Sequence, residues 1–244
     1  MNNSIDPVQC QKQVNRIRRL QNKANVSSFY DNLDESTTDA YKNLRSSFDV
    51  NEYFKILRHL SVEKGWKIDY YYLYTFYSGR PVIFAYDENI NIRVEELSNF
   101  QFGKIPEDIK IDEHYLDHIS LDGTKESFFE YVILAITGEQ FALWWHSNYE
   151  DLEVLCTHEA VEKILNKTRR DYKNLDEKTI TLALRINPTP SVIIKDEYAI
   201  VKIVVFTKWG GFYKLEFHIS KQLPHKELKF NKKLLVGFHC RIWF

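Results

Sequence analysis

Glycine, proline and methionine are scarce in this chain of 244 residues, which contains 8, 6 and 1 of them respectively. Counts this low leave little room for low-complexity linkers, so most of the chain is expected to fold. No apolar run approaches the ~20 residues that cross a bilayer, and residues 1–7 lack the apolar stretch of a signal peptide. The sequence therefore predicts a soluble cytoplasmic protein with no membrane partner.

Cysteine is equally sparse, and the three copies, Cys10, Cys156 and Cys240, are odd in number and far apart. No CxxC pair occurs, which argues against a disulfide framework and against a cysteine-based zinc module. Buried or free thiols in a reducing compartment are the expectation that follows.

The motifs of nucleotide-dependent enzymes are also missing. The chain has no GxxxxGK[ST], GxGxxG or GxSxG sequence and no kinase catalytic loop. We therefore expect no cofactor and favour a non-catalytic protein, while an enzyme built from scattered residues stays open.

Aromatic residues, in contrast, reach 15% of the chain, and they gather in two stretches with one plan. Residues 72–94 and 132–156 each read as a strand, a glycine turn, an aromatic-rich strand, a polar turn and a short strand. The glycines, Gly79 and Gly138, lie 59 positions apart. Residues 127–136 would also suit a helix, but the glycine turn before Phe141 favours a strand. This repetition predicts paired antiparallel β-meanders.

Helices are expected around these meanders. Asp6 followed by Pro7 is a typical helix start, and it predicts a basic amphipathic helix over residues 7–23. Further helices are expected at 38–47, from the Asp49 cap to Gly65, and at 157–165, with strands at 198–206, 212–219 and 234–244.

The predicted fold class is therefore α+β: N-terminal helices followed by antiparallel β-meanders or hairpins with short connecting helices. Three segments are proposed, namely an N-terminal helical segment (1–62), the two meanders (63–165) and a basic, hairpin-rich segment (166–244). The last two segments could form one domain.

The net charge of −1 conceals an uneven distribution. Residues 1–23 carry five basic groups and one acidic group, residues 24–201 carry 19 and 31, and residues 202–244 carry nine and two. The two basic ends could dock on the acidic body, or they could attract an anionic partner.

Candidate binding residues are the aromatic side chains that exceed the need of one sheet core, with one neighbouring histidine. Tyrosine and tryptophan dominate protein interfaces, and a strand rich in tyrosine is expected to show one face to solvent or to a partner. The candidates are Tyr70, Tyr72, Tyr74, Trp144, Trp145, His146 and Trp209.

His114 and His118 form a candidate metal site, because two histidines four positions apart share one face of a helix. One carboxylate from Asp112, Glu113 or Asp117 would complete the ligands. The spacing lacks the glutamate of the HExxH motif, so an ordinary polar surface segment is the competing interpretation.

Basic and aromatic residues are interspersed through the basic C-terminal segment. Surfaces that bind nucleic acid combine these two residue types. The residues are Lys202, Lys208, Lys214, Lys221, Lys226, Lys229, Lys232, Lys233 and Arg241, with Trp209, Phe212, Tyr213 and Phe230. A solvated basic face or an acidic protein partner fits the same pattern.

Three functional hypotheses follow from the sequence. The first is a non-catalytic intracellular protein that acts through protein–protein contacts, for instance as a bacterial immunity or inhibitor protein. The second is a nucleic-acid-binding or nucleic-acid-processing protein, and the third is a metal-dependent hydrolase at His114 and His118. The sequence leaves the oligomeric state open.

Overall fold

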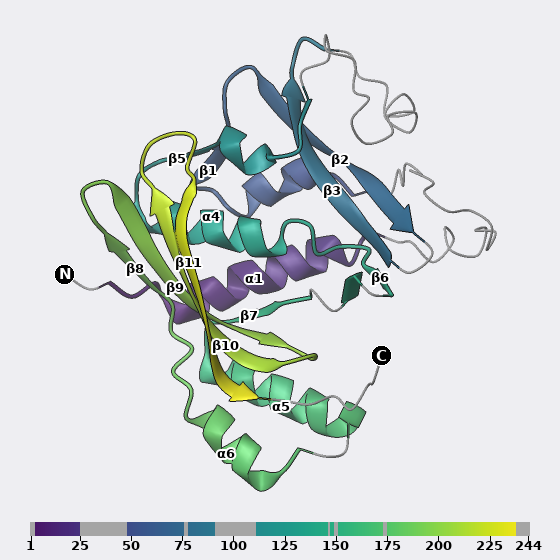
Figure 1. Cartoon of the computed structure of the whole chain (residues 1–244), viewed down its shortest axis with the longest axis vertical. Coiled ribbons are helices and arrows are strands. Elements are labelled where there is room, and N and C mark those ends of the chain that lie inside the picture. The colour runs from purple at the N-terminus through teal and green to yellow at the C-terminus, as the bar shows by residue number, and fades with distance from the viewer. Residues whose placement is uncertain are drawn as a thin grey trace.

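The computed structural model describes residues 3–24, 48–75, 78–90, 111–145, 147–148, 151–172 and 175–237 (Figure 1). Its helices are α1 (Pro7–Gln21), α4 (Lys125–Thr137), α5 (His158–Tyr172) and α6 (Glu177–Leu184), with two 3-10 helices, η1 (Val50–Lys55) and η2 (Tyr115–His118). None of these helices is long and apolar enough to cross a membrane.

The strands of the described residues form three antiparallel sheets. The largest holds β7 (Glu153–Leu155), β8 (Ser191–Ile194), β9 (Tyr198–Thr207), β10 (Gly211–Ser220) and β11 (Glu227–Gly237). A second holds β2 (Trp66–Thr75), β3 (Ser78–Asp87), β4 (Ile111–Asp112) and β6 (Trp144–Trp145), and a third pairs β1 (Leu60–Val62) with β5 (Ile119–Leu121). Helices beside antiparallel hairpins confirm the predicted α+β fold class.

Two long hairpins form near the positions that the sequence predicts, but Gly79, which was expected in the turn of the first, lies within β3 and pairs with Tyr74. In the first, β2 pairs with β3 along ten residues, and in the second, β9 pairs with β10 from Tyr198↔Ser220 to Thr207↔Gly211. Because β10 occupies one edge of β9 along its whole length, the short strands β7 and β8 share the opposite edge. On the far side of β10 lies β11, which ends the sheet.

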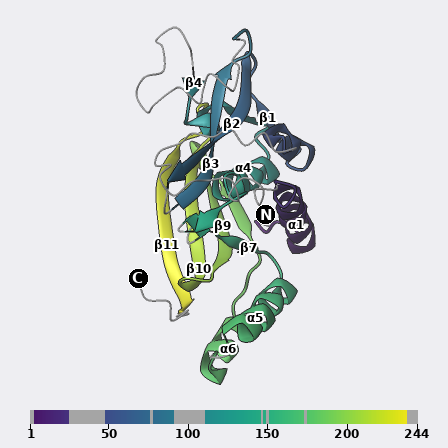
Figure 2. The ribbon, with the colours of Figure 1, turned by 90° about the vertical axis from the view of Figure 1, so that its right-hand side faces the viewer.

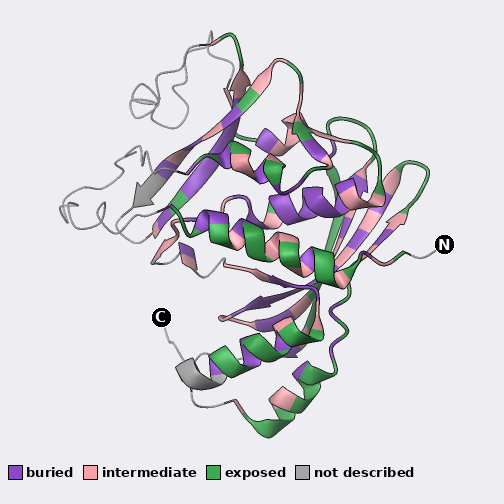
Figure 3. Ribbon diagram, turned by 180° about the vertical axis from the view of Figure 1, so that it is seen from behind, coloured by how far each residue is buried: buried purple, intermediate pink, exposed green. Residues whose placement is uncertain are grey.

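Helix α1 begins as expected, because the Asp6 carboxylate accepts hydrogen bonds from the backbone N–H groups of Val8 and Gln9 at 2.8 and 3.1 Å. These are two of the N–H groups that a helix start otherwise leaves unpaired. Figure 3 shows α1 and α5 exposed along one side and buried along the other, as amphipathic helices require.

Helix α4 corrects the expected strand over residues 127–136. Its residues from Ser127 to Leu134 are all buried, between the largest sheet and strands β1 and β5. A helix that is buried on every side shows no 3.6-residue alternation, so its apolar run cannot be told from a core strand by periodicity. Thr124, whose hydroxyl accepts from the Ser127 N–H, caps the helix start.

The apparent repeat around Gly79 and Gly138 is therefore one of sequence and not of structure. Gly79 lies in β3 of the second sheet, whereas Gly138 follows the last turn of α4 as its C-cap. A Cβ on Gly138 would lie 2.6 Å from the carbonyl oxygen of Leu134 and from the Tyr115 hydroxyl. The strands that follow separate as well, since β6 joins β3 and β7 joins β9.

Two hydrophobic clusters use opposite faces of the largest sheet. Val201, Ile203 and Val205 of β9 point into the larger cluster, which includes α1 and α4, while Val204 and Phe206 point into a second cluster under α5 and α6. This division follows from the alternation of side chains along a strand. Members of the larger cluster come from all three segments proposed from the sequence, whose boundaries remain a prediction.

Several expected boundaries change. The helix expected from Asp49 to Gly65 is the short η1, followed by β1, and α6 forms within the segment that was expected to be rich in hairpins. The helix expected at 157–165 continues to Tyr172 as α5. The last strand begins at Glu227 and not at Leu234, and residues 238–244 lie outside the described part, as do the expected helix 38–47 and most of the short strand at 90–94.

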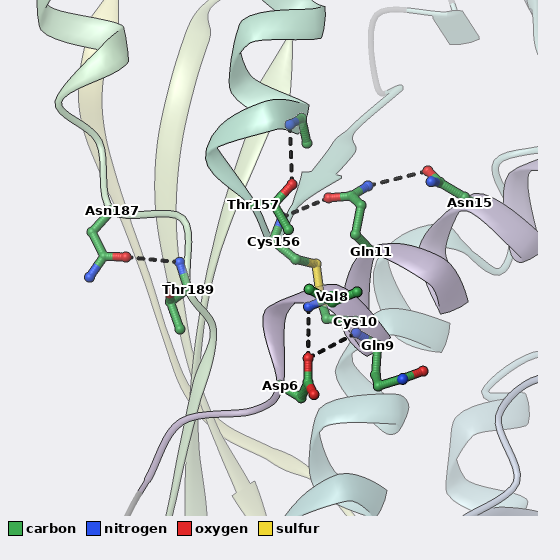
Figure 4. The surroundings of a disulfide bond; sticks show 11 residues. Asp6, Val8, Gln9, Cys10, Gln11, Asn15, Cys156, Thr157, Asn187 and Thr189 are labelled. Atoms are coloured by element: carbon green, nitrogen blue, oxygen red, sulfur yellow. Dashed lines mark hydrogen bonds between the residues drawn. A yellow bond between two sulfur atoms is a disulfide. The ribbon is translucent and has the colours of Figure 1, made fainter.

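A disulfide joins Cys10 of α1 to Cys156, which precedes α5, so the expectation of free thiols is wrong for these two residues (Figure 4). Both side chains are fully buried, and the Gln11 side-chain oxygen accepts a hydrogen bond from the Cys156 N–H beside them at 2.9 Å. Motif spacing says nothing about cysteines that are 146 positions apart and that only the fold brings together. Cys240 lies outside the described residues.

Candidate functional site

Two of the three tyrosines proposed as binding residues lie in the core. Tyr70 packs edge-on against Phe48 and Phe141, and the fully buried Tyr72 donates its hydroxyl proton to the Ala142 carbonyl oxygen at 2.6 Å. Both therefore stabilise the fold and offer no accessible surface to a partner, which corrects their expected exposure. The side chain of Tyr74 lies outside the described part.

The tryptophans lie at turns and short strands. Trp144, which is half-buried, pairs in β6 with Gly79 of β3, and the indole N–H of Trp209 donates to the Asn148 carbonyl oxygen at 3.0 Å. Trp209 thus ties the β9–β10 turn to the segment that follows β6. The Trp145 side chain and His146 are not among the described residues.

The two candidate metal ligands do not share a helical face. His114 precedes η2 with 87% of its side chain exposed, whereas the His118 side chain is 12% exposed and stacks on Trp66 with ring centroids 3.7 Å apart. The two nitrogens of His118 face different carboxylates, Asp112 at 3.0 Å and Glu63 at 3.5 Å. Among the described residues, no three His, Cys, Asp or Glu side chains are placed to hold a metal ion.

The most unusual surface of the described chain is strand β11. Its residues 227–234 are exposed one after another, although alternate residues of a strand usually turn toward a core. Figure 2 shows β11 at the outer edge of its sheet, on the side away from α1. Among the described strands only β10 pairs with it, so the described residues leave its other edge unpaired.

One face of β11 carries its large apolar side chains, with Lys232 among them, and continues the core face of β10. Phe230, Lys232 and Leu234 lie opposite Phe217, Leu215 and Tyr213 in the strand register. Leu228 lies between the registered pairs at an irregularity in the pairing. Leu228, Phe230 and Leu234 are nevertheless 58%, 44% and 52% exposed.

The opposite face of β11 is basic. Lys229 and Lys233 lie on it, and Lys233 stands directly opposite Lys214 of β10. Like charges at directly opposite positions destabilise a sheet. Hydrogen bonds from His218 and Lys202 lower the pKa of the neighbouring Glu216 to about 2, so Glu216 is ionised, but its charge is already paired with Lys202 at 3.0 Å. This face therefore has a surplus of positive charge.

A hollow of ≈ 590 Å³ lies beside the start of β11, between α4 and η2. The charged residues of its lining are mostly acidic, since Glu113, Asp117, Glu139 and Glu227 lie there with His114 and Lys226. Burial raises the pKa of Glu227. We name β11 together with this hollow the β11 surface.

The sequence predictions captured this surface only in part. Phe230 and its neighbouring lysines belong to the predicted basic segment, but Leu228 and Leu234 were not among the candidate binding residues. The signal is present in residues 227–234, Glu-Leu-Lys-Phe-Asn-Lys-Lys-Leu, where apolar and polar residues alternate over the first five. Such a pattern predicts a strand with one apolar and one basic face.

Comparisons of the chain with protein-family models, with curated proteins and with solved structures find no match. The function must therefore be argued from the β11 surface itself.

Proposed function

We propose that this chain is a non-catalytic binding protein and that the β11 surface contacts its partner protein. The observation that carries the proposal is the run of eight exposed residues in β11, which includes three large apolar side chains. Exposed apolar side chains that gather at one place on a folded protein mark interaction sites, and an aromatic such as Phe230 is a typical anchor.

The chemistry of the surface favours a protein partner over nucleic acid. The basic face of Lys214, Lys229 and Lys233 would suit a phosphate backbone. Leu228, Phe230 and Leu234 on the other face instead suit the mixed apolar and charged contacts of a protein interface. Nucleic-acid binding is thus the competing outcome of the test below.

Affinity capture from a native lysate tests the proposal with two matched double variants. Phe230→Asp with Leu234→Asp places charge on the β11 surface, while Leu182→Asp with Leu184→Asp does the same on α6, where both leucines are 43% exposed. We expect the wild type and the α6 variant to retain the same protein at a fixed ratio and the β11 variant to lose it. Unchanged thermal melting confirms that each variant is folded.

Two results would contradict the proposal. One is retention of the same proteins by the β11 variant. The other is capture of nucleic acid alone, with an affinity that falls steeply as salt rises.

An inhibitor or immunity role is the finer form of this proposal. It requires that the captured protein be an enzyme or toxin whose activity falls when the chain binds. Titrating the chain into the isolated partner and following its activity tests that form, and an unchanged activity would leave binding without inhibition.

The cytoplasmic location predicted from the sequence stays a proposal, and the Cys10–Cys156 disulfide argues against it, because disulfides persist mainly in oxidising compartments. Thiol counting on denatured protein, trapped with alkylating agent in its native cells, distinguishes the two. Three reactive thiols indicate the cytoplasm, while a single thiol, from Cys240, indicates an oxidising compartment.

A further inference from the structure

We propose that the open edge of β11 accepts an extended, acidic segment of the partner protein as an additional strand of the sheet. This inference rests on the proposed binding function and specifies the partner's chemistry and the mode of contact.

The backbone of β11 provides the first argument. The strand has 11 residues, and its pairing with β10 satisfies only the N–H and C=O groups that point toward β10. The alternate groups point to the outer edge, where no described strand meets them. An extended segment that pairs there would satisfy these groups, which is how peptides add to sheet edges in other proteins.

The charge of β11 decides which segment can pair. Lysines at edges discourage unspecific strand pairing, and β11 carries three lysines and one glutamate. A second copy of β11 would bring Lys229, Lys232 and Lys233 close to their own counterparts. An acidic segment would instead neutralise them and relieve the repulsion between Lys214 and Lys233. The charge of the edge therefore disfavours pairing with a second copy of β11 and favours pairing with an anionic strand.

The two faces of β11 define the pattern of the partner segment. Side chains that it places on one face meet Phe230 and Leu234, with Lys232 between them, and the alternate side chains meet Lys229 and Lys233. We therefore expect apolar residues alternating with Asp or Glu. The acidic hollow next to Glu227 favours a basic residue at the end of the segment that reaches it.

Synthetic peptides provide the probe. One is an eight-residue peptide that alternates valine with glutamate, and its matched control alternates valine with lysine. Each is titrated into the full-length ¹⁵N-labelled chain, and hydrogen exchange of the β11 amides is followed by NMR. We expect the glutamate peptide to bind, and to slow exchange at alternate residues of 227–237 whose N–H groups face outward.

A charge-reversed variant sharpens the test. Lys229→Glu with Lys233→Glu changes two exposed side chains and leaves the backbone edge intact. It should bind the glutamate peptide about tenfold more weakly and prefer the lysine peptide, because opposite charges on neighbouring strands stabilise and like charges destabilise.

Three outcomes would overturn strand addition. The first is equal binding of both peptides or of neither, and the second is binding without slower exchange in β11, as a docked helix would give. The third is concentration-dependent dimerisation of the chain with slower β11 exchange, which would assign the edge to a second copy.

These outcomes are separable from failure of the proposed function. If a captured partner requires Phe230 and Leu234 yet leaves β11 exchange unchanged, protein binding stands and strand addition falls. If the peptides behave as expected but capture does not depend on β11, the edge accepts strands without being the surface that binds the captured protein.

Discussion

Phe217 and Phe230 pack against each other across neighbouring strands with ring centroids 4.9 Å apart, yet 7% of Phe217 is exposed and 44% of Phe230. The pair marks the line where the core of the largest sheet ends and the β11 surface begins.

Truncation of the two rings should separate their roles. Phe217→Ala leaves a cavity in the core and should lower the free energy of unfolding by roughly 3–5 kcal/mol. Phe230→Ala removes a half-exposed ring and should cost roughly 1 kcal/mol or less, while weakening partner capture. Urea denaturation of both variants checks this, and equal losses of stability would place Phe230 in the core.

Reduction of the disulfide should destabilise the chain without a change of sequence. The Cys10–Cys156 bond closes a loop across a separation of 146 residues. In the loop-entropy account a closure of that length contributes roughly 4–5 kcal/mol. Chemical denaturation with and without reductant measures it, and Cys10→Ser with Cys156→Ser should match the reduced wild type. Reductant should not affect that double variant, since its remaining cysteine, Cys240, has no partner within its own chain.

The pH response of His59 should depend on Asp122. The Nδ1 of His59 lies 2.7 Å from the Asp122 carboxylate, and this hydrogen bond raises the His59 pKa. Burial opposes ionisation of Asp122, but hydrogen bonds from Thr124 and His59 lower its pKa to about 2. The pair therefore stabilises the fold at pH values above the lowered pKa of Asp122 and below the raised pKa of His59. Its contribution falls as pH drops toward 2 and as pH rises above 6.5 through the raised His59 pKa.

Histidine NMR titration tests that coupling. In Asp122→Asn we expect the His59 pKa to fall toward its ordinary value of 6.5. Asp176→Asn removes a carboxylate that caps α6 and should leave the His59 titration unchanged. An identical His59 titration in wild type and Asp122→Asn would show that the contact does not persist in solution.

Glu130 should make the chain less stable as pH rises. This buried carboxylate of α4 accepts hydrogen bonds from the Gln13 side chain at 2.6 Å and from the His59 N–H at 2.8 Å. Burial nevertheless raises its pKa. The folded state therefore holds the proton more tightly than the unfolded state. The resulting stabilisation is complete below pH 4.5 and is lost as pH rises through the raised pKa.

Denaturation at several pH values isolates this effect in Glu130→Gln. The wild type should lose stability relative to the variant between pH 4 and pH 7. Glu126→Gln, on the more exposed side of the same helix, should follow the wild type. A constant difference between Glu130→Gln and wild type across this range would contradict the assignment.

The sequence predicts the local elements of this fold well where the pattern is unambiguous. Asp6 and Pro7 place the start of α1, and alternation places the β9–β10 hairpin, because both signals depend on neighbouring residues alone. Helix α4 was not predicted from the sequence, because burial on all sides removes the periodicity of its apolar residues. The disulfide was not predicted either, because it depends on long-range packing that cysteine spacing does not encode.

The candidate site was less predictable for a related reason. Tyr70 and Tyr72 match the composition of an interface, but exposure depends on what covers a strand, and Phe141 and Ala142 cover these two. Phe230 has the same chemistry as Phe217 and differs because its strand ends the sheet. Strand order, which a single sequence does not state, therefore separates interface from core.

The disulfide has a further consequence for how this chain responds to proteases. Because Cys10 and Cys156 enclose all the residues between them, a single cut within that stretch leaves both fragments covalently joined. A nicked molecule therefore keeps α1 attached to the segment that enters α5, and the fragments separate on a gel only after reduction. A cut between Cys10 and Cys156 thus leaves the chain covalently connected, whereas a cut between Cys156 and β11 breaks the covalent link between strand β11 and the rest.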